Sequence, residues 1–139
     1  MATDSPSPLG FNVRLPLPSD EAIARVTEAL KAEGFGILTR IDVQATLKEK
    51  IGQDFRPYVI LGTCNPHLAY RALSADAAAG LLLPCNVVVE EAEGGSLVRI
   101  VNPDAMMGVP GMEDQAAIQA CGLVTLLILW SQLLASEAL

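Results

Sequence analysis

The sequence has few aromatic residues. They make up 4% of the 139 residues, although 51% of the chain is hydrophobic. A core formed by this chain is therefore expected to be aliphatic, built mainly from Leu, Val, Ile and Ala. The length suits one domain with one core, and the sequence contains neither a repeat nor a linker long enough to divide it.

Basic side chains are also scarce. Nine Lys and Arg stand against 16 Asp and Glu, which gives a formal net charge of -7. The basic residues are scattered, and only Lys48 and Lys50 lie close together in the sequence. Because nucleic-acid binding requires clustered positive charge at the phosphates, we expect no nucleic-acid partner.

The three cysteines are an odd number, which does not suit a complete framework of disulfides. Residues 1–8 are polar and lack the charged segment and apolar run of a secretory signal. These features favour a protein of the reducing cytoplasm. We expect a flexible tail over residues 1–8 and a single domain over residues 9–139.

The chain has a single histidine, His67, which leaves no obvious Ser-His-Asp arrangement. No glycine-rich phosphate loop follows a strand pattern, and no pair of carboxylates stands out among the acidic residues. A Cys64–His67 dyad stays open. The pattern favours a binding or carrier protein without a cofactor over a turnover enzyme; if the chain is active, we expect sulfur transfer or thiol–disulfide exchange.

Residues 115–136 carry no charged side chain, and residues 121–134 are strongly apolar. A segment of this length can span a bilayer. Polar residues dilute it, however, and no Lys or Arg flanks either end. We therefore expect a helix from about residue 113 that is buried in the core or in a dimer interface, rather than a membrane anchor.

Hydrophobic periodicity predicts the remaining elements. Strands are expected at residues 11–17, 35–41, 56–63, 86–91 and 97–101. Helices are expected after Ser19, Asp42 and Asn65, each of which is a favourable N-cap residue before an apolar stripe. The sequence thus predicts an α+β fold, with one mixed or antiparallel sheet of about five strands and helices on one face.

Two short motifs are the most specific features of the chain, Gly62-Thr63-Cys64-Asn65-Pro66 and Leu83-Pro84-Cys85-Asn86. Each places a thiol beside an asparagine and a proline, where an apolar run meets a turn. Further motifs lie at residues 48–52, 55–58 and 101–103. With these motifs in this order, the chain resembles the domain-of-unknown-function 302 family of small bacterial and archaeal proteins, from about Leu15 to its end.

The resemblance implies an α+β fold shaped like half of a TATA-binding protein, usually found as a compact dimer. Shape alone does not imply DNA binding. The family has no agreed activity. Its cysteine motifs fall on Cys64 and Cys85 of this sequence, and some relatives occur beside or fused to sulfur-handling proteins.

Cys64 and Cys85 are the candidate reactive residues. If Asn65 caps a helix, Cys64 lies one residue before the positive end of the helix dipole, which favours a thiolate. A thiolate attacks disulfides or carries a sulfane sulfur. If the third and fourth strands are antiparallel neighbours, Cys85 lies near Cys64, and a disulfide or two-thiol relay becomes feasible. Alternatively, both residues only pack at strand ends.

The other candidate ligand-binding residues are Asn65, His67, Asn86, Met106 and Met107. The asparagine amides can orient a ligand, although capping and turn formation explain them as well. The methionines can form a soft, adaptable wall. Cys121, in the apolar segment, is expected to be buried and inert. Together with His67 the cysteines match no common zinc spacing, so we expect no metal site.

Two functions follow from these residues. The first is a cytoplasmic sulfur carrier or thiol-binding protein, in which Cys64 holds a persulfide or mixed disulfide and Cys85 is the second thiol. Its acidic surface would select a basic sulfur-transfer protein. The second is a non-catalytic homodimeric module that binds a small apolar ligand or a protein partner, with structural cysteines.

Overall fold

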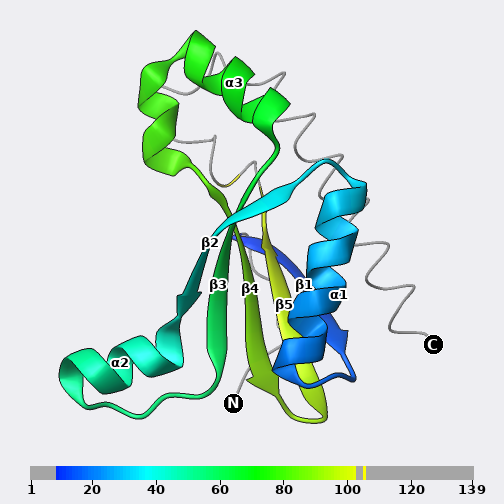
Figure 1. Ribbon diagram of the computed structural model, residues 1–139, viewed down its shortest axis with the longest axis vertical. Coiled ribbons are helices and arrows are strands. Elements are labelled where there is room, and N and C mark those ends of the chain that lie inside the picture. The colour runs from blue at the N-terminus through cyan, green and yellow to red at the C-terminus, as the bar shows by residue number, and fades with distance from the viewer. Residues whose placement is uncertain (1–8, 103–104, 106–139) are drawn as a thin grey trace.

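The computed structural model describes residues 9–102 and Ala105, which form one sheet with helices around it (Figure 1). In chain order the elements are β1 (Gly10–Leu15), α1 (Ser19–Ala32), β2 (Gly36–Asp42), α2 (Val43–Ile51), β3 (Tyr58–Cys64), α3 (Pro66–Ala75), the 3₁₀ helix η1 (Ala77–Leu82), β4 (Cys85–Ala92) and β5 (Gly95–Val101).

The sheet is open and antiparallel throughout, with the strand order β1-β5-β4-β3-β2. The predicted α+β fold with a single five-stranded sheet is therefore confirmed. The tight β4–β5 hairpin includes Gly94, whose φ of +80° is accessible to glycine without steric cost. Among the described strands, β1 and β2 form the two edges.

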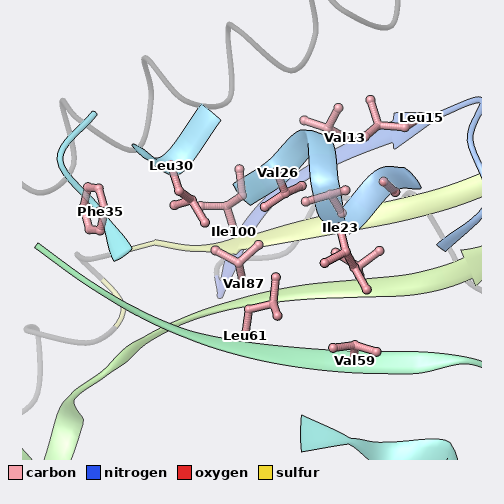
Figure 2. Packing of buried hydrophobic residues seen from close by; sticks show 13 residues of the cluster. Val13, Leu15, Ile23, Val26, Leu30, Phe35, Val59, Leu61, Val87 and Ile100 are labelled. Atoms are coloured by element: carbon pink, nitrogen blue, oxygen red, sulfur yellow. The ribbon is translucent and has the colours of Figure 1, made fainter. Parts of the chain in front are cut away.

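Helix α1 packs along one face of the sheet, while α2 and the α3–η1 pair extend from its two ends (Figure 1). Ile23, Val26 and Leu30 recur at helical spacing on the buried side of α1. Figure 2 shows these side chains directed at the strands. The strands contribute every second residue to this core, namely Val13, Leu15, Val59, Leu61, Val87, Val89, Val98 and Ile100. Burial of each such side chain contributes roughly 1.5–3 kcal/mol.

The start of α1 corrects one expectation. Pro18, not Ser19, is the N-cap residue, and no side chain caps the helix there. The extended Pro18 backbone accepts a hydrogen bond from the Ala22 amide at 2.9 Å, so Ser19 already lies inside the helix. Asp20 and Glu21 lie in the first turn as expected, where they favour the helix dipole.

Several predictions fall outside the described residues. They concern the tail over residues 1–8, Met106, Met107, Cys121 and the last helix. Within the described part of the chain, no helix has the length and apolar character needed to cross a membrane.

Candidate functional site

Cys64 and Cys85 lie at adjacent strand ends. Thr63 pairs with Cys85 across β3 and β4, which confirms the predicted antiparallel contact between these strands. The buried Thr63 hydroxyl donates a hydrogen bond to the Cys85 carbonyl oxygen at 2.9 Å. On its other side, Cys64 pairs with Gly36 of β2. Both cysteines are half-buried free thiols. The strand register sets the backbone of Cys85 opposite Thr63, the residue that precedes Cys64.

Helix α3 begins directly after Cys64. Asn65 is its N-cap, and the Asn65 Oδ1 atom accepts hydrogen bonds from the amides of His67 at 3.1 Å and Leu68 at 3.4 Å. Pro66 occupies the first helical position, where its missing N–H costs nothing. The predicted helix start is therefore confirmed. It sets the positive end of the α3 dipole beside Cys64.

The two thiols differ in their surroundings. Burial, and secondly the negative charge of an ionised Cys64, raise the pKa of the Cys85 thiol to about 11. Cys85 is therefore a neutral thiol near pH 7. A neutral thiol is a poor nucleophile, because the thiolate is the attacking species. Cys85 is thus the less suitable of the two residues to begin thiol chemistry.

Gly62 allows β2, β3 and the segment before β4 to pack closely. A Cβ atom at this position would collide with Thr39 Oγ1 and lie 2.9 Å from Pro84 Cγ. Pro84 follows a cis peptide bond with Leu83. The glycine and proline of the two cysteine motifs are therefore in mutual contact, which a sequence pattern alone does not reveal.

The other predicted site residues that the structure describes are Asn65, His67 and Asn86, each within three residues of a cysteine in the sequence. His67 is exposed in the first turn of α3. The side chain of Asn86 lies on the sheet face turned away from α1, since the neighbouring Val87 faces the core. Within the described ranges, no three His, Cys, Asp or Glu side chains are grouped to hold a metal ion.

A buried ion cluster was missed by the sequence analysis. Glu90 is fully buried in β4, and its carboxylate accepts hydrogen bonds from Arg56 at 2.7 and 3.0 Å and from Arg99 at 2.8 Å. The Arg56 guanidinium also lies over the Phe55 ring, 4.6 Å from its centroid. The sequence contains one signal for this cluster: Glu90 directly follows three valines in one strand of a hairpin, and Arg99 lies in the other strand.

A cavity of about 510 Å³ lies beside this cluster. Its described lining residues are Leu9, Gly10, Asn12, Asn86, Val88, Arg99, Ile100, Val101 and Ala105. Asn12 and Val88 are the strand neighbours of Arg99 on either side, so all three side chains share the face turned away from α1. Asn86 is the one predicted ligand-binding residue that lines this cavity among those the structure describes.

Comparison with known proteins agrees with the motifs. Residues 11–123 match the family described as "Domain of unknown function DUF302". The crystal structure of an uncharacterised conserved DUF302 protein from Bacillus stearothermophilus is similar, with 32% sequence identity and a TM-score of 0.81; the match covers 94% of this chain and 99% of that chain. No protein with a curated description matches the sequence.

Proposed function

The chain belongs to the DUF302 family, whose description gives no activity, and from the chain's own residues we propose that it is a thiol-based sulfur carrier. Cys64 holds a sulfane sulfur as a persulfide, or forms a mixed disulfide, and Cys85 is the second thiol. Cys64 lies directly before α3, and the thiol of Cys85, on the neighbouring strand β4, stays protonated near pH 7. This arrangement is the observation that carries the proposal.

The positive end of the α3 dipole lies next to Cys64. The Asn65 side chain accepts hydrogen bonds from the His67 and Leu68 amides, so these amides are not available to Cys64. The helix therefore acts on Cys64 through the electric field of its dipole. Because Cys64 is only half-buried, a small donor can reach its sulfur atom. These are the conditions under which a cysteine becomes reactive.

Loading begins with attack of the Cys64 thiolate on the outer sulfur of a persulfide donor, R–S–SH. The new bond joins the two sulfurs, the donor S–S bond breaks, and R–S⁻ leaves with the electron pair. Cys64 then carries –S–SH. An acceptor thiolate attacks this outer sulfur and regenerates the Cys64 thiolate, so that no external oxidant is required.

Cys85 has a specific consequence for the carrier. If the Cys85 thiolate attacked the inner sulfur of the Cys64 persulfide, a Cys64–Cys85 disulfide would form and HS⁻ would leave. The raised pKa of Cys85 keeps the attacking thiolate scarce near pH 7, which slows this discharge. Cys85 is therefore a resolving thiol that becomes effective at alkaline pH.

Sulfur loading tests the proposal directly. The reduced protein is incubated with polysulfide at pH 7.5, and peptide mass spectrometry locates any added sulfur atoms. We expect the addition on Cys64 and its loss in Cys64→Ser, while Cys85→Ser retains it for longer than the unmodified chain. Unchanged loading in Cys64→Ser would rule out the carrier.

We further propose two kinds of protein partner. The net charge of -7 suits a basic sulfur-transfer protein as donor or acceptor. A homodimer, as implied by the family resemblance, is supported by edge strand β2, where Leu38 and Ile41 are 65% and 46% exposed. Light scattering should then report a dimer, and Ile41→Lys should shift it towards the monomer at the same protein concentration.

The competing proposal is a non-catalytic binding module in which both cysteines are structural. It is supported by the largely apolar cavity on the sheet face turned away from α1. A Cys64→Ala/Cys85→Ala double variant that folds and keeps its ligand or partner would favour it. If the same double variant loses both its sulfur loading and its protein partner, the carrier is favoured.

A further inference from the structure

The α3–η1 pair carries a cluster of exposed apolar side chains. Tyr70 and Leu81 are 75% and 88% exposed, and Leu73 is also exposed. Tyr70 and Leu73 are three residues apart on α3, so they share one side of the helix. A Cβ atom on Gly80 would lie 3.7 Å from Leu73 Cδ2, which sets η1 and its Leu81 beside Leu73. We call Tyr70, Leu73 and Leu81 the apolar tip.

The apolar tip adjoins an uncharged stretch of the chain. Residues 77–89 contain no charged side chain, although 18% of the chain is charged. Asp76, directly before this stretch, uses its carboxylate to cap η1, where it accepts a hydrogen bond from the Ala78 amide at 2.9 Å. Arg71, exposed on α3, is of a residue type enriched in protein interfaces, as is Tyr70. An exposed surface of this kind is typical of a site that contacts another molecule.

The apolar tip is inserted between the two thiol-bearing strands. β3 ends with Cys64 and α3 starts at Pro66, while η1 ends three residues before Cys85. Figure 1 shows α3 beyond the end of the sheet at which β3 ends. Tyr70 lies four residues after Pro66, which is about 6 Å along the helix axis. A protein seated on the apolar tip therefore lies beside the end of β3 that carries Cys64.

We propose that the apolar tip is the docking surface for the protein that donates sulfur to Cys64, and that this donor presents a cysteine persulfide beside an apolar patch of its own. The inference rests on the proposed carrier function. In the transfer, the Cys64 thiolate attacks the outer sulfur of the donor's persulfide, the donor's S–S bond breaks, and the donor's thiolate leaves with the electron pair.

The size of the apolar tip supports a transient partner. Its three side chains expose roughly 400 Å², which is comparable with the largest apolar patch on a typical monomer. A stable interface buries about 800 Å² per partner. The tip is therefore too small to hold a second copy permanently, and it suits a donor that leaves after each transfer. The net charge of -7 can attract a basic donor over a long range, while the tip determines where that donor docks.

Two synthetic peptide persulfides of equal length and zero net charge test the docking surface. In one, the persulfidated cysteine is flanked by leucine and phenylalanine, and in the other by serine and glycine. We expect the apolar peptide to load Cys64 at least about fivefold faster than the polar peptide, because contact with the tip holds it beside Cys64. Peptide mass spectrometry measures both rates. Equal rates for the two peptides would overturn the proposal.

Three variants locate the preference. Tyr70→Asp and Leu81→Asp should each remove most of it, whereas Ile51→Asp, at an exposed apolar position on α2, should retain it. All three sites are exposed, so the variants should fold. Loading by polysulfide should be the same in all three variants and in the unmodified chain, because polysulfide is too small to need the tip. A preference that survives both tip substitutions would contradict the assignment.

A peptide that cannot transfer sulfur separates docking from the carrier function. With serine in place of its cysteine, the apolar peptide should still perturb the amide NMR signals of Tyr70, Leu73 and Leu81. If these shifts occur but polysulfide fails to load Cys64, the carrier is wrong and the docking surface stands. If polysulfide loads Cys64 but the shifts are absent or confined to other surfaces, the docking surface is wrong and the carrier stands.

Two controls test other occupants of the apolar tip. Light scattering should report the same oligomeric state for Leu81→Asp as for the unmodified chain, and a shift to monomer would assign the tip to a second copy. The unmodified chain should not sediment with phosphatidylcholine vesicles. Sedimentation that is lost in Leu81→Asp would assign the tip to a membrane surface. Either result would overturn the proposal.

Discussion

Thr63 of β3 lies opposite Cys85 of β4 and donates its hydroxyl hydrogen to the Cys85 carbonyl oxygen at 2.9 Å. This pairing fixes the register at the end of the two strands. Cys64, the next residue of β3, ends the strand directly before the N-cap of α3. The proposed roles of the two thiols depend on this arrangement.

The raised pKa of Cys85 predicts a loss of stability in alkali. Above pH 9 the unfolded chain loses the thiol proton that the folded chain retains up to about pH 11, so rising pH favours unfolding. A difference of this size corresponds to about 2 kcal/mol between pH 9 and 11. Urea unfolding across this range should show the loss in the unmodified chain. The loss should be smaller by that amount in Cys85→Ser, and an identical pH dependence of the two proteins would contradict the assignment.

Replacement of Glu90 should be destabilising. Glu90→Gln leaves a neutral amide at a fully buried position, while water can partly hydrate the Arg56 and Arg99 side chains, which are 35% and 29% exposed. We therefore expect a loss of roughly 1–3 kcal/mol in the free energy of unfolding. The surface pair Lys48–Asp54 is a matched control, since its side chains are 63% and 92% exposed. Asp54→Asn should change stability by less than about 1 kcal/mol. Similar losses for both variants in urea unfolding would show that burial of the Glu90 cluster is energetically unimportant.

Loss of the Asn65 cap should affect both stability and thiol reactivity. Asn65→Ala removes the acceptor for the His67 and Leu68 amides, with an expected cost of about 1 kcal/mol. Because the first turn of α3 then frays, alkylation of Cys64 should slow. Asp76→Ala is the control: it removes the cap of η1, where Asp76 accepts from the Ala78 amide at 2.9 Å. It should lower stability without changing the alkylation rate of Cys64, as followed by mass spectrometry.

Gly62 should tolerate no side chain. In Gly62→Ala the new methyl group collides with Thr39 and Pro84, and the resulting strain should destabilise the protein by about 1–3 kcal/mol. At Gly36, which pairs with Cys64 in β2, an added Cβ atom would meet no other atom within 4 Å. Gly36→Ala should therefore be nearly neutral in thermal unfolding. Equal effects of the two substitutions would mean that β2 and β3 move apart readily.

The sequence predicted most of the fold because its signals are local. Alternation marked the first strand and short apolar runs marked others, such as residues 58–61. Asp42 and Asn65 marked two helix starts through side-chain caps that the structure contains. The start of α1 was displaced by one residue because Pro18, a residue without a capping side chain, ends the extended segment. The turn at η1 was missed, since its alanine-rich sequence has no strong periodicity.

The candidate site was predicted only in part. The proximity of Cys64 and Cys85 followed from one assumed strand pairing, which the structure contains. To predict the cluster at Glu90, one must know that Arg56 and Arg99, which lie outside β4, both reach the Glu90 carboxylate. Local sequence patterns do not give this information. The same holds for the cavity, which joins residues of β1, β4 and β5.

The most direct test of the carrier is a competition between the two thiols for iodoacetamide in the folded protein. Peptide mass spectrometry should follow each cysteine separately between about pH 6 and 11. We expect Cys64 to be labelled at least about tenfold faster than Cys85 at pH 7.5, and the Cys85 rate to keep rising up to about pH 11. Faster labelling of Cys85 at pH 7.5, or labelling of Cys64 only after unfolding, would contradict the proposed role of Cys64.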